Sequence, residues 1–271
     1  MEKNNYAIKL TETAIMLTLA TVLSLFKLID LPYGGSVTIA SMLPIVIISY
    51  RHGLKWGLLG GFAGGIIQQL LGLNTLSYVT TWQSILAVIL LDYILAFGFE
   101  GLGGVFRKKT SQPQALVLGS LLVCLIRYIC HVISGATVWA GLSIPTNAAL
   151  IYSLGYNATY MIPETIVTML VAYYVGSMLD FRQTRIARLQ TGSAENVPVL
   201  KWVAGLVAVA GIIIDTALVF SKLQNAESGD FDITGLSQVN WTLVLVVTAI
   251  SIIAAAVILI YNRKRGNAAH S

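Results

Sequence analysis

Eight apolar stretches, each poor in charged residues, alternate with shorter polar ones along the chain. A helix needs about 20 residues to cross the hydrocarbon core of a bilayer. We place the eight segments at 9–29, 36–50, 53–72, 80–103, 114–138, 157–180, 200–220 and 241–261. No strict alternation of apolar and polar residues runs long enough for a membrane β-barrel, and backbone groups in lipid must be bonded within their segment. The pattern therefore predicts an all-α integral membrane protein.

One polar stretch, RQTRIARLQTGSAENVP at 182–198, is the clearest boundary in the chain. It separates six apolar segments within residues 1–181 from two within residues 199–265. We therefore expect a six-helix bundle, a cytoplasmic linker and a C-terminal two-helix transmembrane hairpin. We assign the hairpin no function: it could be a packing accessory, a dimerisation surface or a contact for another protein.

The composition and the distribution of charge agree with a membrane location. Only 11% of the residues are charged and 56% are hydrophobic, with a mean hydropathy of +0.77, whereas soluble domains carry roughly 25% charged residues. The net charge of +5 does not indicate nucleic-acid binding, because 14 of the 17 basic residues fall on one side of the predicted bilayer. Cytoplasmic loops are enriched in Lys and Arg. Both chain termini are therefore expected in the cytoplasm.

Ionisable residues within the apolar segments are the first candidates for function, because charges at bilayer depth are costly. Asp92 lies midway along the fourth segment, and Arg127 and His131 lie in the fifth. A spacing of four residues places Arg127, His131, Gly135 and Trp139 along one helix stripe. Structural interpretations are also open: Asp92 and Arg127 could form an ion pair, His131 could be a hydrogen-bonded buried side chain, and Trp139 could lie at the membrane interface.

Polar aromatic residues extend this candidate site toward the predicted outer side. Residues 139–163 contain no charge but several aromatic and amide side chains, namely Tyr152, Tyr156, Asn157 and Tyr160. Tyr93 adds a hydroxyl beside Asp92. One carboxylate, one imidazole and several aromatic rings suit a small, flat, cationic heteroaromatic ligand, because aromatic faces attract cations and a carboxylate neutralises them.

Motifs for other chemistries are missing from the sequence. It contains no G-x-x-x-x-G-K-[ST] phosphate loop, no H-E-x-x-H motif and no cysteine–histidine cluster. We therefore expect no enzymatic activity, no cofactor and no metal ion. Cys124 and Cys130 are expected to be buried free thiols. The glycines of GLLGGFAGGIIQQ at 57–69 favour close helix packing over phosphate binding.

Five pieces of the sequence, in order and at consistent spacing, are similar to one family. They are LTETAIML at 10–17, PYGGSV at 32–37, LLDYILAF at 90–97, RYICHVISGATVW at 127–139 and YSLGYNATYM at 152–161. They resemble the thiamine-specific substrate-binding (S) components of energy-coupling factor (ECF) transporters, the ThiT/YuaJ family. The resemblance covers roughly residues 6–181 and does not extend to the hairpin.

The resemblance implies a six-helix S-component bundle in the bacterial cell membrane. Its thiamine pocket would lie near the outer face, closed by the loop between the first two segments. The implied pocket residues are Asp92, Tyr93, His131, Gly135, Trp139, Tyr152 and Asn157. The family carboxylate can be Glu where this chain has Asp92. Gly35 and Gly64 stand where some members have tryptophan, so ring stacking would depend more on Trp139.

The resemblance also implies how uptake is powered. An S component binds the vitamin and docks on a separate membrane-embedded T component, which is driven by two ATPase subunits. Docking in the family uses small residues on the first helix, which correspond to Ala14 and Thr18. Small residues four apart let a partner helix approach closely. Alternatively, Ala14 and Thr18 pack inside the bundle.

Two other functions compete with this interpretation. A stand-alone secondary transporter of a small cationic heteroaromatic could use Asp92 and His131 as proton carriers. A membrane-embedded enzyme acting on a lipid or prenyl substrate would have the same two residues as its only candidate couple. No acidic motif of the D-D-x-x-D kind supports the enzyme.

Overall fold

A computed structural model of the chain describes residues 2–31, 34–138, 146–189, 199–223 and 232–268. The chain divides into two compact units, Met1–Ala187 and Arg188–Ser271, and the division falls inside the polar stretch 182–198. The assignment of separate roles to the two parts of the chain stays a prediction.

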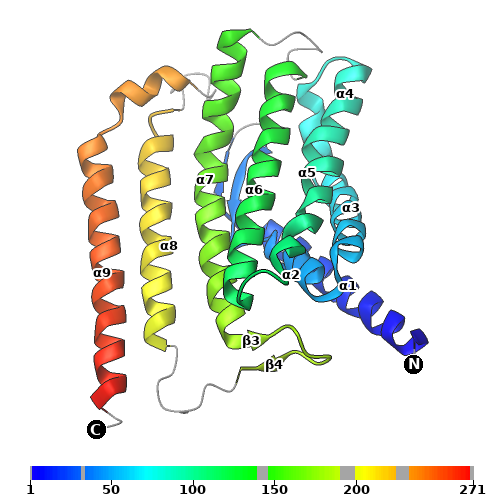
Figure 1. Cartoon of the computed structure of the whole chain (residues 1–271). Coiled ribbons are helices and arrows are strands. Elements are labelled where there is room, and N and C mark those ends of the chain that lie inside the picture. Colours follow the sequence, from blue (N-terminus) through cyan, green and yellow to red (C-terminus); the bar gives the residue numbers. More distant parts are fainter. Residues whose placement is uncertain (1, 32–33, 139–145, 190–198, 224–231, 269–271) are drawn as a thin grey trace. The chain divides into compact units, whose positions relative to one another are not determined.

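The first unit is built almost entirely of helices (Figure 1). Its elements in chain order are α1 (Glu2–Leu25), β1 (Lys27–Asp30), β2 (Ser36–Thr38), α2 (Leu43–His52), α3 (Leu54–Leu71), η2 (Leu73–Tyr78), α4 (Trp82–Val88), the π-helix η3 (Ile89–Leu95), α5 (Ala96–Gly98), η4 (Phe99–Phe106), α6 (Gln112–Thr137), α7 (Asn147–Met178), β3 (Leu179–Asp180) and β4 (Ala187–Arg188). The second unit contains α8 (Val199–Phe220), η5 (Ile233–Gln238) and α9 (Trp241–Ala268).

The prediction of an all-α membrane protein is confirmed. Six helical stretches among the described residues are long and apolar enough to span a bilayer. They are Tyr6–Leu25, Trp82–Phe106, Gln112–Thr137, Asn147–Met178, Leu200–Phe220 and Trp241–Arg263. Each contains at least 20 residues, which is the length that a helical span needs.

The prediction of a span at 36–50 is wrong. Its first residues form β2, which pairs antiparallel with β1, and its helix α2 has only 10 residues. Gly53, at φ 92°, separates α2 from α3, a backbone conformation that glycine adopts without strain. The segment predicted at 157–180 instead begins at Asn147, where the Thr146 side chain accepts a hydrogen bond from the backbone N–H of Ala149.

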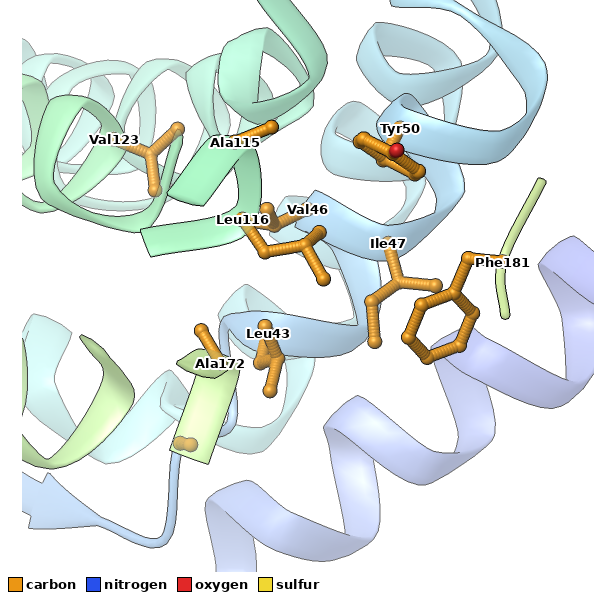
Figure 2. Packing of buried hydrophobic residues seen from close by; sticks show 10 residues of the cluster. Leu43, Val46, Ile47, Tyr50, Ala115, Leu116, Val123, Ala172 and Phe181 are labelled. Carbon is orange, nitrogen blue, oxygen red and sulfur yellow. The ribbon is translucent and has the colours of Figure 1, made fainter. Parts of the chain in front are cut away.

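Helix α2 forms the centre of the first unit because other elements surround it. It packs against α1, α3, α6 and η4, and its residues from Leu43 to Tyr50 are buried. Figure 2 shows side chains of α2 interdigitating with those of α6 and α7 and with Phe181. Helices within a bilayer gain little from the hydrophobic effect, so such packing holds them together through van der Waals contact. An apolar run can therefore be a short buried helix as well as a span.

Glycines on one face of α3 allow the span Trp82–Phe106 to approach closely. The sequence predicted such close helix packing for these glycines. A Cβ atom at Gly57 would lie 2.5 Å from the carbonyl oxygen of Gly101. At Gly61 it would lie 2.5 Å from the carbonyl oxygen of Gly98, and at Gly65 it would lie 2.8 Å from that of Tyr93. These distances are too short for any side chain. The backbone of η3, α5 and η4 is therefore held directly against α3.

In the second unit, α8 and α9 run side by side in opposite directions (Figure 1). Thr248 of α9 donates a hydrogen bond of 2.6 Å to Oδ2 of Asp215 on α8. The other carboxylate oxygen of Asp215 is buried and has no hydrogen-bond partner among the described residues. The Thr248 hydroxyl therefore satisfies one of the two carboxylate oxygens of Asp215.

Candidate ligand-binding site

The first unit encloses a cavity of about 530 Å³. Pockets for small molecules typically measure 300–1,000 Å³. Side chains from β2, α3, η2, η3, α6 and α7 line it. Six of the seven predicted pocket residues are among them, namely Asp92, Tyr93, His131, Gly135, Tyr152 and Asn157. The seventh, Trp139, lies outside the described residues.

Asp92 is held in place by two hydrogen-bond donors on α6. Its Oδ1 lies 2.7 Å from Nδ1 of His131, and its Oδ2 accepts a 2.6 Å hydrogen bond from the Ser134 hydroxyl. Asp92 belongs to the π-helix η3, a wider turn that is often found at functional sites. The carboxylate thus has a fixed orientation at the cavity wall.

His131 has a single tautomer in this arrangement. The Nε–H of Arg127 donates to Nε2 of His131 over 3.2 Å. Because an arginine side chain only donates, Nε2 must be the acceptor and the ring proton lies on Nδ1. That proton is therefore donated to Asp92. In this arrangement the Asp92 carboxylate accepts both of its described bonds.

Arg127 forms its ion pair with Glu100, so the alternative of an Asp92–Arg127 pair is wrong. The Nη1 atom of Arg127 lies 3.2 Å from Oε1 of Glu100, and its guanidinium lies 4.1 Å from the centroid of the Phe97 ring. The Glu100 side chain is 1% exposed. Buried charges of this kind are tolerated when they are paired.

Glu164 of α7 is a second carboxylate at the cavity wall. It is 3% exposed and accepts hydrogen bonds from the backbone N–H and the hydroxyl of Thr38 in β2. The hydroxyl of Ser41 lies 2.8 Å from that of Thr38. These contacts connect the segment between α1 and α2 to the middle of α7.

Tyrosines spaced four residues apart on α7 form an aromatic wall. The rings of Tyr152 and Tyr156 are parallel, with centroids 6.4 Å apart, and Tyr160 meets Tyr156 edge to face at 5.8 Å. The Tyr160 hydroxyl donates to Oδ1 of Asn157 over 2.6 Å. The backbone N–H of Gly35 donates to the Tyr156 hydroxyl over 3.2 Å. The cavity therefore combines carboxylates with aromatic faces.

The comparisons with known proteins agree with this site. The family model described as thiamine transporter protein (Thia_YuaJ) matches residues 10–181. The chain belongs to the Thia_YuaJ family. It is 35% identical over 187 residues to the thiamine transporter ThiT of Bacillus subtilis (strain 168). The aligned region covers 63% of this chain and 91% of that protein.

A solved structure of a Thia_YuaJ-type protein supports the fold. The structure of ThiT from Listeria monocytogenes superposes with a TM-score of 0.51 at 22% sequence identity. The likeness covers 64% of this chain and 94% of that one. The family match ends at residue 181, so α8 and α9 lie outside it.

The two glycines that the resemblance places where some members have tryptophan lie in different parts of the first unit. Gly35 lines the cavity, where a Cβ atom would lie 2.7 Å from the Tyr160 ring, so a larger residue would displace that ring. Gly64 is not a lining residue, and a Cβ there would lie 3.0 Å from Ile45 of α2. Of the two, only the change at Gly35 acts on the cavity directly.

Gly135 and the two predicted docking residues have clear positions. A side chain at Gly135 would collide with the hydroxyl of Ser153, so this glycine lets α6 and α7 approach beside the cavity. Ala14 and Thr18 are exposed on α1. Their spacing of four residues places both on one face of the helix, where the Thr18 hydroxyl donates to the Ala14 carbonyl. They do not pack inside the bundle.

Two functional candidates were absent from the sequence-based set. Glu164 lies within an apolar segment, and the criterion that selected Asp92 also applies to it. Glu100 lies three residues before the predicted end of its segment, where an acidic residue is expected near the membrane surface. Among the described residues, no cluster of His, Cys, Asp and Glu side chains could hold a metal ion.

Proposed function

We propose that this chain is a thiamine-binding S component that captures thiamine for ATP-driven import. The observation that carries the proposal is the cavity, in which an oriented carboxylate lies in the same space as stacked tyrosines. Thiamine is a cation that contains two heteroaromatic rings. Aromatic faces attract such a cation, and a desolvated contact contributes about 2 kcal/mol.

The proposed ligand contacts are the seven predicted residues, including Trp139. We assign Asp92 the role of charge partner and Tyr152 that of an aromatic wall, with Asn157 and Tyr93 as hydrogen-bonding groups. Support for these roles comes from the six that line one cavity. The positive charge of Arg127 is already paired with Glu100, so it does not cancel the attraction of Asp92 for a cation.

We further propose that Ala14 and Thr18 contact an ECF T component, which two ATPase subunits drive. Their exposure on one face of α1 supports this role, since small residues permit close helix contact. The positive-inside rule supports cytoplasmic termini. The similarity to ThiT of Bacillus subtilis supports a location in the bacterial cell membrane. Thiamine uptake that requires the ATPase subunits would separate this mechanism from a stand-alone secondary transporter.

The first test is calorimetry of the purified full-length protein in detergent. We expect saturable binding of thiamine at micromolar concentration without ATP or any partner, because the proposed contacts all lie on this chain. Thiamine phosphates and pyridoxine serve as competitors of related chemistry. A titration with thiamine that releases no saturable heat, repeated by tryptophan fluorescence, would contradict the proposal.

The hairpin of α8 and α9 is expected to be dispensable for binding. None of the residues that line the cavity lies beyond Glu164. A protein truncated near residue 190 is therefore expected to bind thiamine within about threefold of the full-length affinity, which is less than 1 kcal/mol. Size-exclusion chromatography would check its folding. A well-folded truncated protein with much weaker binding would show that the hairpin shapes the cavity.

A further inference from the structure

Glu100, which is buried, and Arg127, which lies at the cavity wall, form an ion pair to which we assign no contact with the ligand. Arg127 lies on α6, one helical turn before His131, and Glu100 lies on η4. Arg127 contacts the proposed ligand-binding residue His131 through a hydrogen bond from its Nε to Nε2 of the ring. Because a buried ion pair often contributes little net stability, its presence beside the cavity calls for another explanation.

We propose that Glu100 and Arg127 are positioning residues that keep His131 neutral, so that the Asp92 carboxylate retains its full charge for a cationic ligand. The inference rests on the proposed function. His131 occupies the space between Arg127 and Asp92, bonded to one through Nε2 and to the other through Nδ1. The state of its ring therefore decides what Asp92 presents to the cavity.

The hydrogen bond from Arg127 opposes protonation of the ring at Nε2. An imidazolium carries N–H groups on both nitrogens, so its Nε2–H would point at the Nε–H of Arg127. The guanidinium would also repel it as a like charge. A charged His131 would in turn neutralise Asp92 from inside the protein. Asp92 would then have less attraction for a cation in the cavity.

Glu100 makes this role of Arg127 possible. Without a partner, the guanidinium would be an uncompensated charge near the cavity and would itself attract Asp92. The carboxylate of Glu100 compensates the charge, and the face of Phe97 lies against the guanidinium at the cavity wall. Oε2 of Glu100 is buried and has no hydrogen-bond partner among the described residues, so the ion pair is its main compensation.

Other ionisable groups around His131 leave this arrangement unchanged. From η3, Asp92 and Tyr93 face the cavity beside it. From α7, the centroid of the Tyr160 ring lies 6.2 Å from that of the imidazole. Glu164, also on α7, is hydrogen-bonded to Thr38. From η4, Glu100 reaches it only through Arg127. Arg127 is thus the cation in hydrogen-bond contact with His131 among the described residues.

The decisive variant replaces both charges by apolar residues of similar size, Glu100→Leu with Arg127→Met. Replacing a buried pair as a whole is usually neutral or stabilising, whereas removing one partner is strongly destabilising. The double variant is therefore expected to fold. In it, Nε2 of His131 has lost its donor and is free to take a proton as the pH falls.

The experiment measures thiamine affinity by calorimetry between pH 5.5 and 8, together with the ¹⁵N NMR signals of His131, assigned by their loss in His131→Gln. In the wild-type protein we expect the Nδ1–H tautomer throughout and a nearly constant affinity. In the double variant we expect protonation of His131 and affinity at least tenfold weaker at pH 5.5 than at pH 8. Tyr128→Phe, which removes a hydrogen bond from α6 to the Leu154 carbonyl of α7, is the control with a flat profile.

Two results would overturn the inference. One is a wild-type His131 that carries its proton on Nε2 or is charged at pH 7. The other is a folded double variant with the same pH profile as the wild-type protein. If the wild-type protein failed to bind thiamine, the proposed function would fail, while the NMR signals would still report the tautomer and its dependence on Arg127.

Discussion

Asp92→Asn is expected to weaken thiamine binding about 100-fold while leaving the empty protein nearly as stable as before. The loss of one charge-assisted contact to a cation accounts for roughly 2.7 kcal/mol. The empty protein keeps its hydrogen bonds, because the asparagine Oδ1 accepts from His131 and its amide group donates to the Ser134 hydroxyl, which can rotate. Calorimetry and thermal denaturation of the same preparation measure the two effects.

Asp92→Glu is the matched control for this prediction. It retains the charge and adds one methylene, and the resemblance implies that glutamate is compatible with the same pocket. Its affinity is expected to stay within about tenfold of the wild-type value, a difference of 1.4 kcal/mol. A stable Asp92→Asn protein that binds thiamine normally would remove Asp92 from the site. An unstable Asp92→Asn protein with normal thiamine affinity would show that Asp92 has a structural role only.

Gly61→Ala is expected to destabilise the first unit more than most single changes. Its Cβ would lie 2.5 Å from the carbonyl oxygen of Gly98, and backbone atoms cannot rotate aside as a side chain can. Overpacking a close contact costs about 3 kcal/mol. For a unit of this size, thermal denaturation is expected to show a Tm lower by roughly 10 °C.

Gly60→Ala provides the control at the neighbouring position of α3. There the nearest atom to an added Cβ is the Cδ1 of Ile48 at 3.4 Å, an ordinary contact with a flexible side chain. Alanine is also the better helix former by about 1 kcal/mol. An unchanged or slightly higher Tm is therefore expected. Equal effects of the two substitutions would contradict the close approach of α3 and the span Trp82–Phe106.

Part of the site could be predicted because charges in apolar segments are rare. Asp92 and His131 stand out on that basis alone, and the structure places them in direct contact. The same criterion applied to Glu164 would have added the second carboxylate. The partner of Arg127 could not be inferred, because its two neighbours Asp92 and Glu100 lie on one span, and only the winding of that span decides between them.

The fold could be predicted where length and hydropathy suffice. The six long spans meet that condition, whereas the segments predicted at 36–50 and 53–72, which form the 10-residue α2 and the 18-residue α3, are not among them. Hydrophobicity cannot distinguish a short helix enclosed by protein from one that crosses lipid, because both are apolar on every side. The β1–β2 pairing depends on hydrogen bonds between backbone groups at Lys27–Asp30 and Ser36–Thr38, which leave no signal in an apolar run.

The π-helix η3 has a consequence for how this protein can vary in evolution. A π-turn closes i→i+5 hydrogen bonds and so holds an extra residue relative to an α-helix. If the same residues wound as an α-helix, the extra residue would turn everything after it by about 100°. Glu100 would then face away from Arg127. The π-turn is therefore as much a part of the site as the chemistry of the two carboxylates, because it absorbs the extra residue and keeps Glu100 facing Arg127.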